Sequence, residues 1–483
     1  MNWFSAHLPI LPEVIVLSMS CIILLASAYI QKNRYLAYLL AQVTVIGAVY
    51  ACFFVTYNIS QATSLFNHSF VWDRMTLLMT LASCLGMFLV YMFARQYNEE
   101  HDIMNCEFYV LSLLSLLGMM VLISATSLLT LYLGLELMSL PLYAMVALKR
   151  AKERCIEAAI KYFVMGAIAS GILLYGFSLL FGVAQSLDLR IIANVLTAPQ
   201  FHASILVIFA CVFIIAGMAF KLGAVPFHMW VPDVYDGAPN SVTLFISSIP
   251  KLAVFVLLAR LVSGPLSSVM GHWDQVLVFT GVLSVVVGNI VAVVQNNIKR
   301  MLAYSSIAHM GYMLLGLATL SPRGHSAALF YMITYVLVSL SAFGVITAIS
   351  RRGLEITMIS DLTGLSKRNP WVSFMMMLIM FSLAGVPPLV GFIAKIDILE
   401  ALIQANMVWA AVIAIIFAIV GAYYYIRVVK VMYFDDQPSS SPLDDVVYCA
   451  SESYLAITLC GVAILLLGMF PDWLFNICRA TLG

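Results

Sequence analysis

The chain has 483 residues, of which 63% are hydrophobic and only 10% are charged, and its formal net charge is +1. Soluble domains carry about 25% charged residues, and a soluble fold of this length could not hide so much apolar surface from water. The composition therefore excludes a water-soluble enzyme and predicts a polytopic membrane protein. The small net charge also excludes the basic surface that nucleic-acid binding requires.

Long apolar runs follow one another along the whole sequence. A transmembrane helix needs about 20 mostly apolar residues, and fourteen runs meet that need, whereas the alternating pattern of a membrane β-barrel is absent. The predicted fold is therefore all-α, with about 14 transmembrane helices. The expected spans are 9–30, 35–57, 71–94, 107–124, 126–148, 156–183, 203–227, 241–262, 274–295, 300–320, 326–349, 371–405, 407–433 and 449–470. Glu13 interrupts the first run, and no basic residue precedes Lys32, so we expect a retained helix rather than a cleaved signal peptide.

The basic residues predict the orientation of these helices. With the N-terminus outside, fifteen Lys and Arg residues fall in the loops on the inner side and five on the outer side. This asymmetry follows the positive-inside rule. An even number of helices then places both termini on the outer, periplasmic side.

Four lysines and one glutamate lie inside apolar runs: Lys161, Lys221, Lys251, Lys395 and Glu136. A charge near the centre of a membrane helix costs about 2.5–3.5 kcal/mol on insertion scales. A long side chain can avoid part of this cost by reaching the lipid headgroups. Lys251 lies too near the middle of its run to do so, and the side chain of Glu136 is too short. We therefore expect functional roles for these buried charges.

Three of the runs are interrupted beside a lysine. Pro387 and Pro388 interrupt the twelfth run just before Lys395, Lys221 is followed by LGAVPFH, and Lys251 directly follows a proline. Proline removes a backbone donor and breaks helices. A packing kink would explain any single break, but broken helices also expose helix ends that stabilise ions at membrane depth. We therefore predict that helices 7 and 12 are discontinuous at functional positions.

The spacing of the buried residues predicts an internal repeat. Lys221 precedes Lys395 by 174 residues, and Glu136 precedes His309 by 173 residues. Five helices per repeat is an odd number, so the second copy must enter the membrane from the opposite side, as in transporters with inverted repeats. The predicted organisation is helices 1–3 in residues 1–100, a first repeat in 101–265, an inverted second repeat in 266–435, and helix 14 with the C-terminus in 436–483.

Histidine, lysine and glutamate at membrane depth can bind and release protons as their surroundings change. His228 and His309 are natural intermediates in such a row, although each could instead hydrogen-bond a helix end. Lys161 lies only six residues into its run, so it could also reach the headgroups or pair with Glu157 at i−4. The resulting hypothesis is proton movement along a row of buried titratable groups.

The sequence contains no motif for an electron carrier. None of the nine cysteines forms a C-x-x-C pair, and neither G-x-G-x-x-G nor G-K-[ST] occurs. These absences exclude the usual spacings for iron–sulfur clusters, structural zinc and nucleotides. We therefore expect no cofactor and no metal ion in this chain.

Four long segments resemble one known family. They are LYLGLELMSLPLYAMVAL around Glu136, EAAIKYFVMGAIAS around Lys161, GMAFKLGAVPFHMWVPDVYDGAP around Lys221 and QNNIKRMLAYSSIAHMGY around His309. They are similar to the antiporter-like membrane subunits of respiratory complex I, and the VPDVYDGAP ending favours the subunit-N branch of NADH-quinone oxidoreductase. The resemblance covers nearly the whole chain and is densest from about 107 to 430.

This resemblance implies a proton-translocating subunit of a larger complex in the bacterial inner membrane. It implies that Glu136 pairs with Lys221, that Lys161 and Lys251 connect the halves, and that Lys395 exchanges protons with the far side. NADH, FMN, iron–sulfur clusters and quinone would belong to other subunits, and sister antiporter-like subunits would be partners. Two alternatives stay open: a cation/proton antiporter subunit, and a scaffold that conducts nothing. Sodium transport without NADH would favour the first, and tolerance of neutral substitutions at all four lysines would favour the second.

Overall fold

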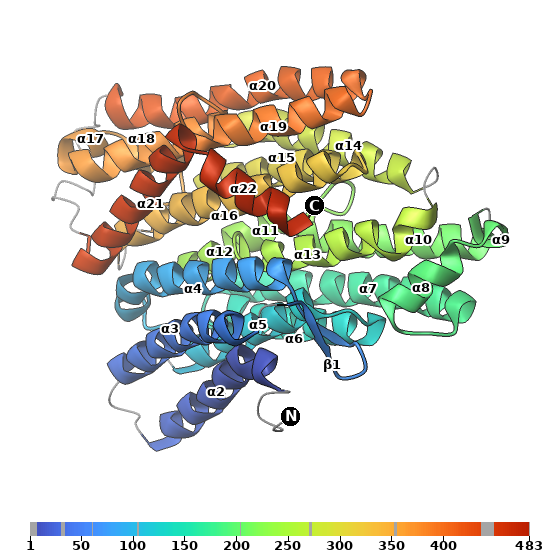
Figure 1. Ribbon diagram of the computed structural model, residues 1–483. Coiled ribbons are helices and arrows are strands. Elements are labelled where there is room, and N and C mark those ends of the chain that lie inside the picture. The colour runs from blue at the N-terminus through green and yellow to red at the C-terminus, as the bar shows by residue number, and fades with distance from the viewer. Residues whose placement is uncertain are drawn as a thin grey trace. The chain divides into compact units, whose positions relative to one another are not determined.

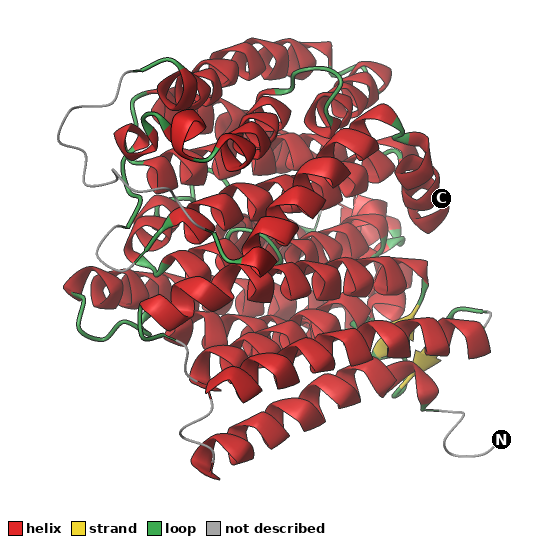
Figure 2. Cartoon of the chain, turned by 90° about the vertical axis from the view of Figure 1, so that its left-hand side faces the viewer, coloured by secondary structure: helices red, strands yellow, loops and turns green. Residues whose placement is uncertain are grey.

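The computed structural model describes residues 7–29, 34–59, 61–103, 106–202, 204–269, 273–351, 355–435 and 449–482. Among these residues the secondary structure is helical apart from one short hairpin (Figures 1 and 2). Lys32 and Arg352, which count among the inner-side cations, lie outside the described residues.

The elements succeed one another in the order η1 (Leu8–Ile10), α2 (Leu11–Tyr29), α3 (Arg34–Asn58), β1 (Thr63–Leu65), β2 (Phe70–Trp72), α4 (Arg74–Glu100), α5 (Cys106–Ser124), α6 (Leu128–Val146), α7 (Glu153–Ala184), α8 (Leu189–Leu196), α9 (Pro199–His202), α10 (Ile205–Leu222), α11 (Trp230–Gly237), α12 (Asn240–Ile246), α13 (Pro250–Ser263), η2 (Pro265–Val269), α14 (Asp274–Val293), α15 (Ile298–Ala318), α16 (Pro322–Ile349), η3 (Ile359–Leu362), α17 (Leu365–Arg368), α18 (Pro370–Ala384), α19 (Val390–Gln404), α20 (Val408–Tyr433), α21 (Ser451–Met469) and α22 (Asp472–Leu482).

The predicted membrane helices are confirmed. Thirteen spans in the described residues are long and apolar enough to cross a membrane, and Pro370–Ala384 is a shorter apolar helix that belongs to the predicted twelfth run. The chain is therefore an all-α polytopic membrane protein of about 14 helices. The short amphipathic α22 follows the last span and has no counterpart among the predicted runs.

The start predicted for the third run is wrong. Residues 70–72 form strand β2, which pairs antiparallel with β1 in the register Thr63↔Trp72, and helix α4 begins only at Arg74 (Figure 2, yellow strands). Left-handed backbone at Phe66, Asn67 and His68 turns the chain between the strands. The apolar triplet Phe70–Trp72 satisfies a hydropathy count in either conformation, so composition alone could not separate strand from helix.

The break predicted in the twelfth run is present. Helix α18 ends at Ala384, where Gly385 adopts φ +86°, and α19 begins at Val390 (Figure 1, orange). The amide of Gly385 donates to the carbonyl oxygen of Phe381 at 3.0 Å, which closes the last turn of α18. Only glycine adopts this left-handed conformation without strain.

The other two predicted breaks are also present. Helix α10 ends at Leu222, and an irregular segment containing Pro226 leads to α11 at Trp230. The eighth span consists of α12 and α13, which are separated before Pro250. Proline at the first position of α13 fits there because its missing N–H has no intrahelical partner at a helix start.

The chain forms two compact units. The first comprises Met1–Tyr91, Ile103–Leu222 and Ile249–Leu277, and the second comprises Met92–Asp102, Gly223–Ser248 and Val278–Gly483. In the second unit α15 and α16 form the interior, since 94% and 89% of their spans are buried, against 33% for α20. The exposed side of α20 is apolar, as expected for a surface that meets lipid or another subunit.

Candidate functional site

The first unit contains Glu136, Lys161, Lys221 and Lys251, and the second contains His228, His309 and Lys395.

Lys221 meets two hydroxyls of α6. It lies in the last turn of α10, and its Nζ donates to Ser139 Oγ at 3.1 Å and to Tyr143 Oη at 3.0 Å, while it stands 5.6 Å from the centre of the Tyr143 ring. Glu136, Ser139 and Tyr143 follow at i, i+3 and i+7, which places them on one face of α6. The ammonium therefore reaches hydroxyls, and no direct ion pair joins it to Glu136.

Glu136 has an unsatisfied carboxylate oxygen. Its Oε1 is buried and has no hydrogen-bond partner among the described residues. A buried polar oxygen without a partner is energetically costly.

Lys161 and Lys251 have different surroundings. Lys161 Nζ lies 2.8 Å from Glu157 Oε1, and 41% of the Lys161 side chain is exposed, so the i−4 pair that the sequence allows is present. Lys251 is only 3% exposed and lies directly after Pro250 at the start of α13. The two lysines therefore differ in exposure: Lys251 is buried, whereas Lys161 lies near the surface.

His309 is held between two tyrosines. Its Nδ1 lies 2.6 Å from Tyr331 Oη on α16, and its Nε2 lies 3.1 Å from Tyr425 Oη on α20. Tyr425 is also hydrogen-bonded to Ser305, one turn before His309 on α15. A hydroxyl can donate or accept, so both the neutral and the protonated imidazole find partners here.

Lys395 contacts the end of α18. Its Nζ donates to the carbonyl oxygens of Leu383 at 2.8 Å and Ala384 at 3.0 Å. The last carbonyls of a helix have no intrahelical partner and form the negative end of its dipole. A side chain at position 385 would crowd this contact, because a Cβ there would lie 3.1 Å from Lys395 Cδ.

A small cavity lies between His309 and the Lys395 contact. Its volume is about 10 Å³, and its walls include His309, Tyr331, Ser382 and Leu383. This size is close to the minimum that one water molecule needs. The cavity thus reaches from the imidazole to the helix end whose carbonyl group accepts from Lys395.

His228 lies in the irregular segment between α10 and α11. Its carbonyl oxygen accepts from the amide of Val231 at 2.9 Å, and its buried Nδ1 has no hydrogen-bond partner among the described residues. His309 belongs to the same unit, but there its ring nitrogens face the hydroxyls of Tyr331 and Tyr425. The acids that follow Lys395 differ from each other: Glu400 pairs with Arg323, whereas Asp397 is only 8% exposed.

Sequence reasoning missed the hydroxyls that surround these groups. Ser139 and Tyr143 could have been found, because they follow Glu136 at helical spacing within the same run. Tyr425 lies 116 residues from His309, and no local pattern connects the two.

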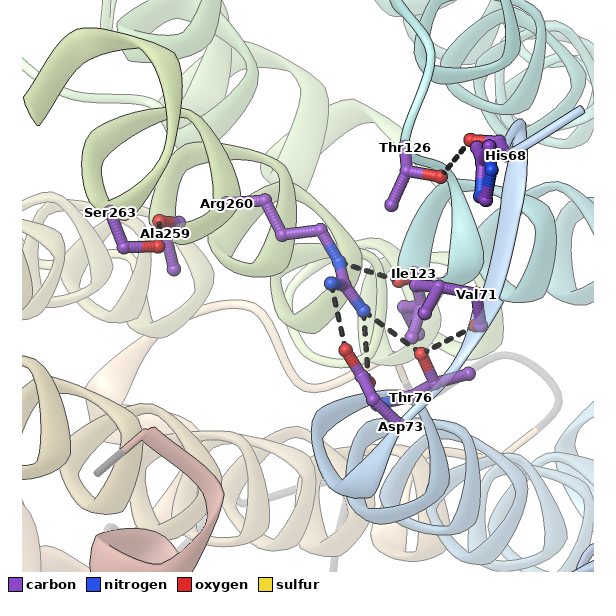
Figure 3. Close-up of polar contacts among 9 residues, drawn as sticks. All are labelled: His68, Val71, Asp73, Thr76, Ile123, Thr126, Ala259, Arg260 and Ser263. Atoms are coloured by element: carbon purple, nitrogen blue, oxygen red, sulfur yellow. Dashed lines mark hydrogen bonds and ion pairs between the residues drawn. The ribbon is translucent and has the colours of Figure 1, made fainter. Parts of the chain in front are cut away.

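One charged cluster of the first unit is structural. Arg260 at the end of α13 donates to both carboxylate oxygens of Asp73 at 3.0 and 3.1 Å, to Thr76 Oγ1 at 2.9 Å and to the carbonyl oxygen of Ile123 at 3.1 Å (Figure 3). Burial by itself would raise the pKa of the Asp73 carboxyl, but the Arg260 guanidinium and the Thr76 hydrogen bonds outweigh it and hold that pKa below its usual value. Arg260, which the sequence places among the outer-side cations, therefore ties α13 to α4 and α5.

Within the described residues no group of three or more His, Cys, Asp or Glu side chains could hold a metal ion.

Known proteins are similar to this chain in sequence and in fold. The family model described as NADH:quinone oxidoreductase/Mrp antiporter, TM, matches residues 125–421. The NADH-quinone oxidoreductase subunit N of Coxiella burnetii is 54% identical, and the alignment covers 97% of each chain. A chain of respiratory complex I from Thermus thermophilus superposes with a TM-score of 0.82 at 30% identity, covering 96% of this chain and 98% of that chain. A chain of the Mrp complex from a Dietzia species shares the fold, with a TM-score of 0.86 at 20% identity, covering 100% and 98% of the two chains. The chain therefore belongs to the NADH:quinone oxidoreductase/Mrp antiporter family of membrane subunits, and within it to subunit N of NADH-quinone oxidoreductase.

Proposed function

We propose that this subunit of NADH:quinone oxidoreductase moves protons across the membrane through buried titratable residues, driven by redox chemistry in other subunits. In the first unit the acting residues are Glu136, Lys161, Lys221 and Lys251. In the second unit they are His228, His309 and Lys395. NADH, FMN, iron–sulfur clusters and quinone bind to other subunits of the complex.

The observation that carries the proposal is the kind of partner that the buried amines have. Lys221 donates to two hydroxyls, and Lys395 donates to two main-chain carbonyls. An amine in a close ion pair is held in its charged form, and its deprotonation leaves a buried carboxylate without its counter-charge. Hydroxyls and carbonyls accept hydrogen bonds from an ammonium and from a neutral amine, so these two lysines can release a proton and keep their place.

The proposed organisation follows from the spacing of the buried residues. Residues 101–265 form a first repeat and residues 266–435 an inverted second repeat, in which Lys221 and Lys395 occupy corresponding positions. Lys221 lies just before one helix break, and Lys395 lies just after the other. The flanking segments are 1–100 and 436–483. In this arrangement the inner membrane of a bacterium holds the chain with both termini on the periplasmic side, beside sister antiporter-like subunits.

Substitution of Lys221 tests the proposal. In membranes that contain the assembled complex, we expect Lys221→Ala to lower the number of protons moved per NADH oxidised. Lys221→Arg, which keeps a permanent charge that cannot be released, should lower it as well. Lys430→Ala is the control, since 67% of that side chain is exposed. Normal proton pumping in both Lys221 variants, with normal assembly, would refute the proposal.

Two alternatives have distinct outcomes. If the purified chain carried sodium in liposomes without NADH, it would act as a cation/proton antiporter subunit. If neutral substitutions at all four lysines left pumping intact, the chain would be a scaffold. Copurification of NADH:quinone oxidoreductase activity and flavin with a tagged chain separates the proposed subunit from a free-standing antiporter.

A further inference from the structure

A second cluster of titratable groups lies at another place in the second unit. Tyr97 and His101 are at the C-terminal end of α4, Glu355 follows α16, and Asn240 begins α12. Tyr97 and Asn240 are 1% and 3% exposed. Three separate segments of the second unit thus bring an acid, an imidazole, a phenol and an amide together.

The hydrogen bonds determine which atoms of this cluster donate and which accept. Tyr97 Oη donates to Glu355 Oε1 at 3.0 Å and accepts from the backbone amide of Asn240 at 3.2 Å. His101 Nδ1 lies 2.9 Å from the carbonyl oxygen of Tyr97. Because a carbonyl can only accept, this nitrogen carries the hydrogen, and the exchangeable position of the ring is Nε2.

The exchangeable nitrogen faces the acid. His101 Nε2 lies 3.8 Å from Glu355 Oε1, and the imidazole stacks on the Tyr97 ring with centroids 4.0 Å apart. The two side chains differ in exposure, at 27% for Glu355 and 8% for His101. A proton that arrives from water therefore meets the carboxylate first and the buried imidazole second.

The interior beyond this pair is polar. Asn240 Nδ2 donates to Ser350 Oγ at 2.9 Å, and Ser350 is 3% exposed. Ser350 also accepts from the amide of Ile356 at 3.3 Å, so its hydroxyl lies between two segments of the cluster.

The segment that presents Glu355 is anchored. The amide of Ile356 donates to Ser350 Oγ at 3.3 Å, and the carbonyl oxygen of Thr357 accepts from the amide of Ile298 at 2.9 Å. The backbone that follows Glu355 is therefore fixed to the end of α16 and the start of α15 by contacts that do not involve the Glu355 side chain.

We propose that Glu355 and His101 form a proton-loading pair for the second unit, with Tyr97 as the positioning residue. The pair takes one proton from water at this end of the helices and holds it on His101 Nε2 opposite the Glu355 carboxylate. It then releases one proton toward the buried hydroxyls of Tyr97 and Ser350, which both contact Asn240. Only O–H and N–H bonds form and break, and no electron moves. This inference rests on the proposed function, since it assigns the uptake step of the same proton transport.

Glu355→Gln tests the inference in membranes that contain the whole complex. This variant keeps the size of the side chain and its ability to accept from Tyr97, but it cannot take up a proton. We expect a loss of protons moved per NADH oxidised at an unchanged amount of assembled complex. Glu355→Asp, which keeps the carboxylate, should restore much of the ratio. His101→Gln should show the same loss as Glu355→Gln, and it serves as the second variant if the first does not assemble.

Glu452→Gln is the matched control. Glu452 is also a partly exposed carboxylate (33%) that pairs with a residue of α4, but its partner is the permanently charged Arg95. It should leave the pumping ratio unchanged. If Glu355→Gln and His101→Gln both pump normally while Lys221→Ala does not, the inference is overturned and the proposed function stands. If Lys221→Ala and Lys221→Arg also pump normally in assembled complex, the proposed function itself fails.

Discussion

Removing the carboxylate from Asp73 should destabilise the first unit. Asp73 receives two hydrogen bonds from a guanidinium whose side chain is only 12% exposed, and 27% of its own side chain is exposed. Removing one partner of a buried ion pair costs about 3–5 kcal/mol, and the partial exposure of Asp73 reduces this loss, because water screens the charge. The bonds from Arg260 to Thr76 and Ile123 remain, so we expect Asp73→Ala to cost about 2–3 kcal/mol.

Thermal unfolding of the detergent-solubilised protein measures this effect. For a unit of this size, about 2–3 kcal/mol corresponds to a fall in Tm of roughly 5–10 °C. Asp188→Ala is the control, because Asp188 pairs with Arg190, whose side chain is 59% exposed, and it should shift Tm far less. The double variant Asp73→Ala/Arg260→Ala should lose less stability than the sum of the two single changes, because the two residues interact directly. Equal Tm shifts for Asp73→Ala and Asp188→Ala would refute the reasoning.

Three further predictions concern single positions. Lowering the pH should remove the stability that Asp73 contributes, because, despite burial, Arg260 and Thr76 hold its folded pKa below the value in the unfolded chain. The contribution is complete above the unfolded pKa and is lost as the pH falls through the folded pKa. Acid titration of Tm should therefore show the values for wild type and Asp73→Ala converging. Gly385→Ala should cost about 1–2 kcal/mol, because φ is +86° there, and should slow pumping by displacing Lys395; unchanged pumping at normal assembly would contradict this. Tyr425→Phe should cost about 1 kcal/mol and slow pumping by leaving His309 Nε2 without its hydroxyl, whereas equal pumping rates for wild type and variant would show that this bond plays no part.

Much of the candidate site could be predicted from local sequence. Lys395 stands out because a charge in an apolar run has an energetic cost that composition reveals, and Pro387 marks the break beside it whatever the rest of the chain does. The pairing of Lys161 with Glu157 could also be expected, since i and i+4 are neighbours on any helix.

Contacts between distant segments could not be predicted in this way. The sequence places Glu136 beside Lys221 only through resemblance, and the structure gives Lys221 two hydroxyls of α6 instead of a direct ion pair. The proton-loading pair is a clearer case, because His101 and Glu355 are 254 residues apart and both look like ordinary loop residues near helix ends.

The sequence by itself determined the all-helical membrane architecture, the positions of the spans and the breaks beside Lys221 and Lys395. These properties depend on hydropathy and on backbone chemistry within a few residues, so neighbours in the chain suffice to specify them. The tertiary structure alone decided which hydroxyls hold His309, which helix end meets Lys395 and where the β-hairpin replaces the start of a helix. Those outcomes depend on which side chains distant helices bring within about 3 Å of one another, and the packing of whole helices sets such distances.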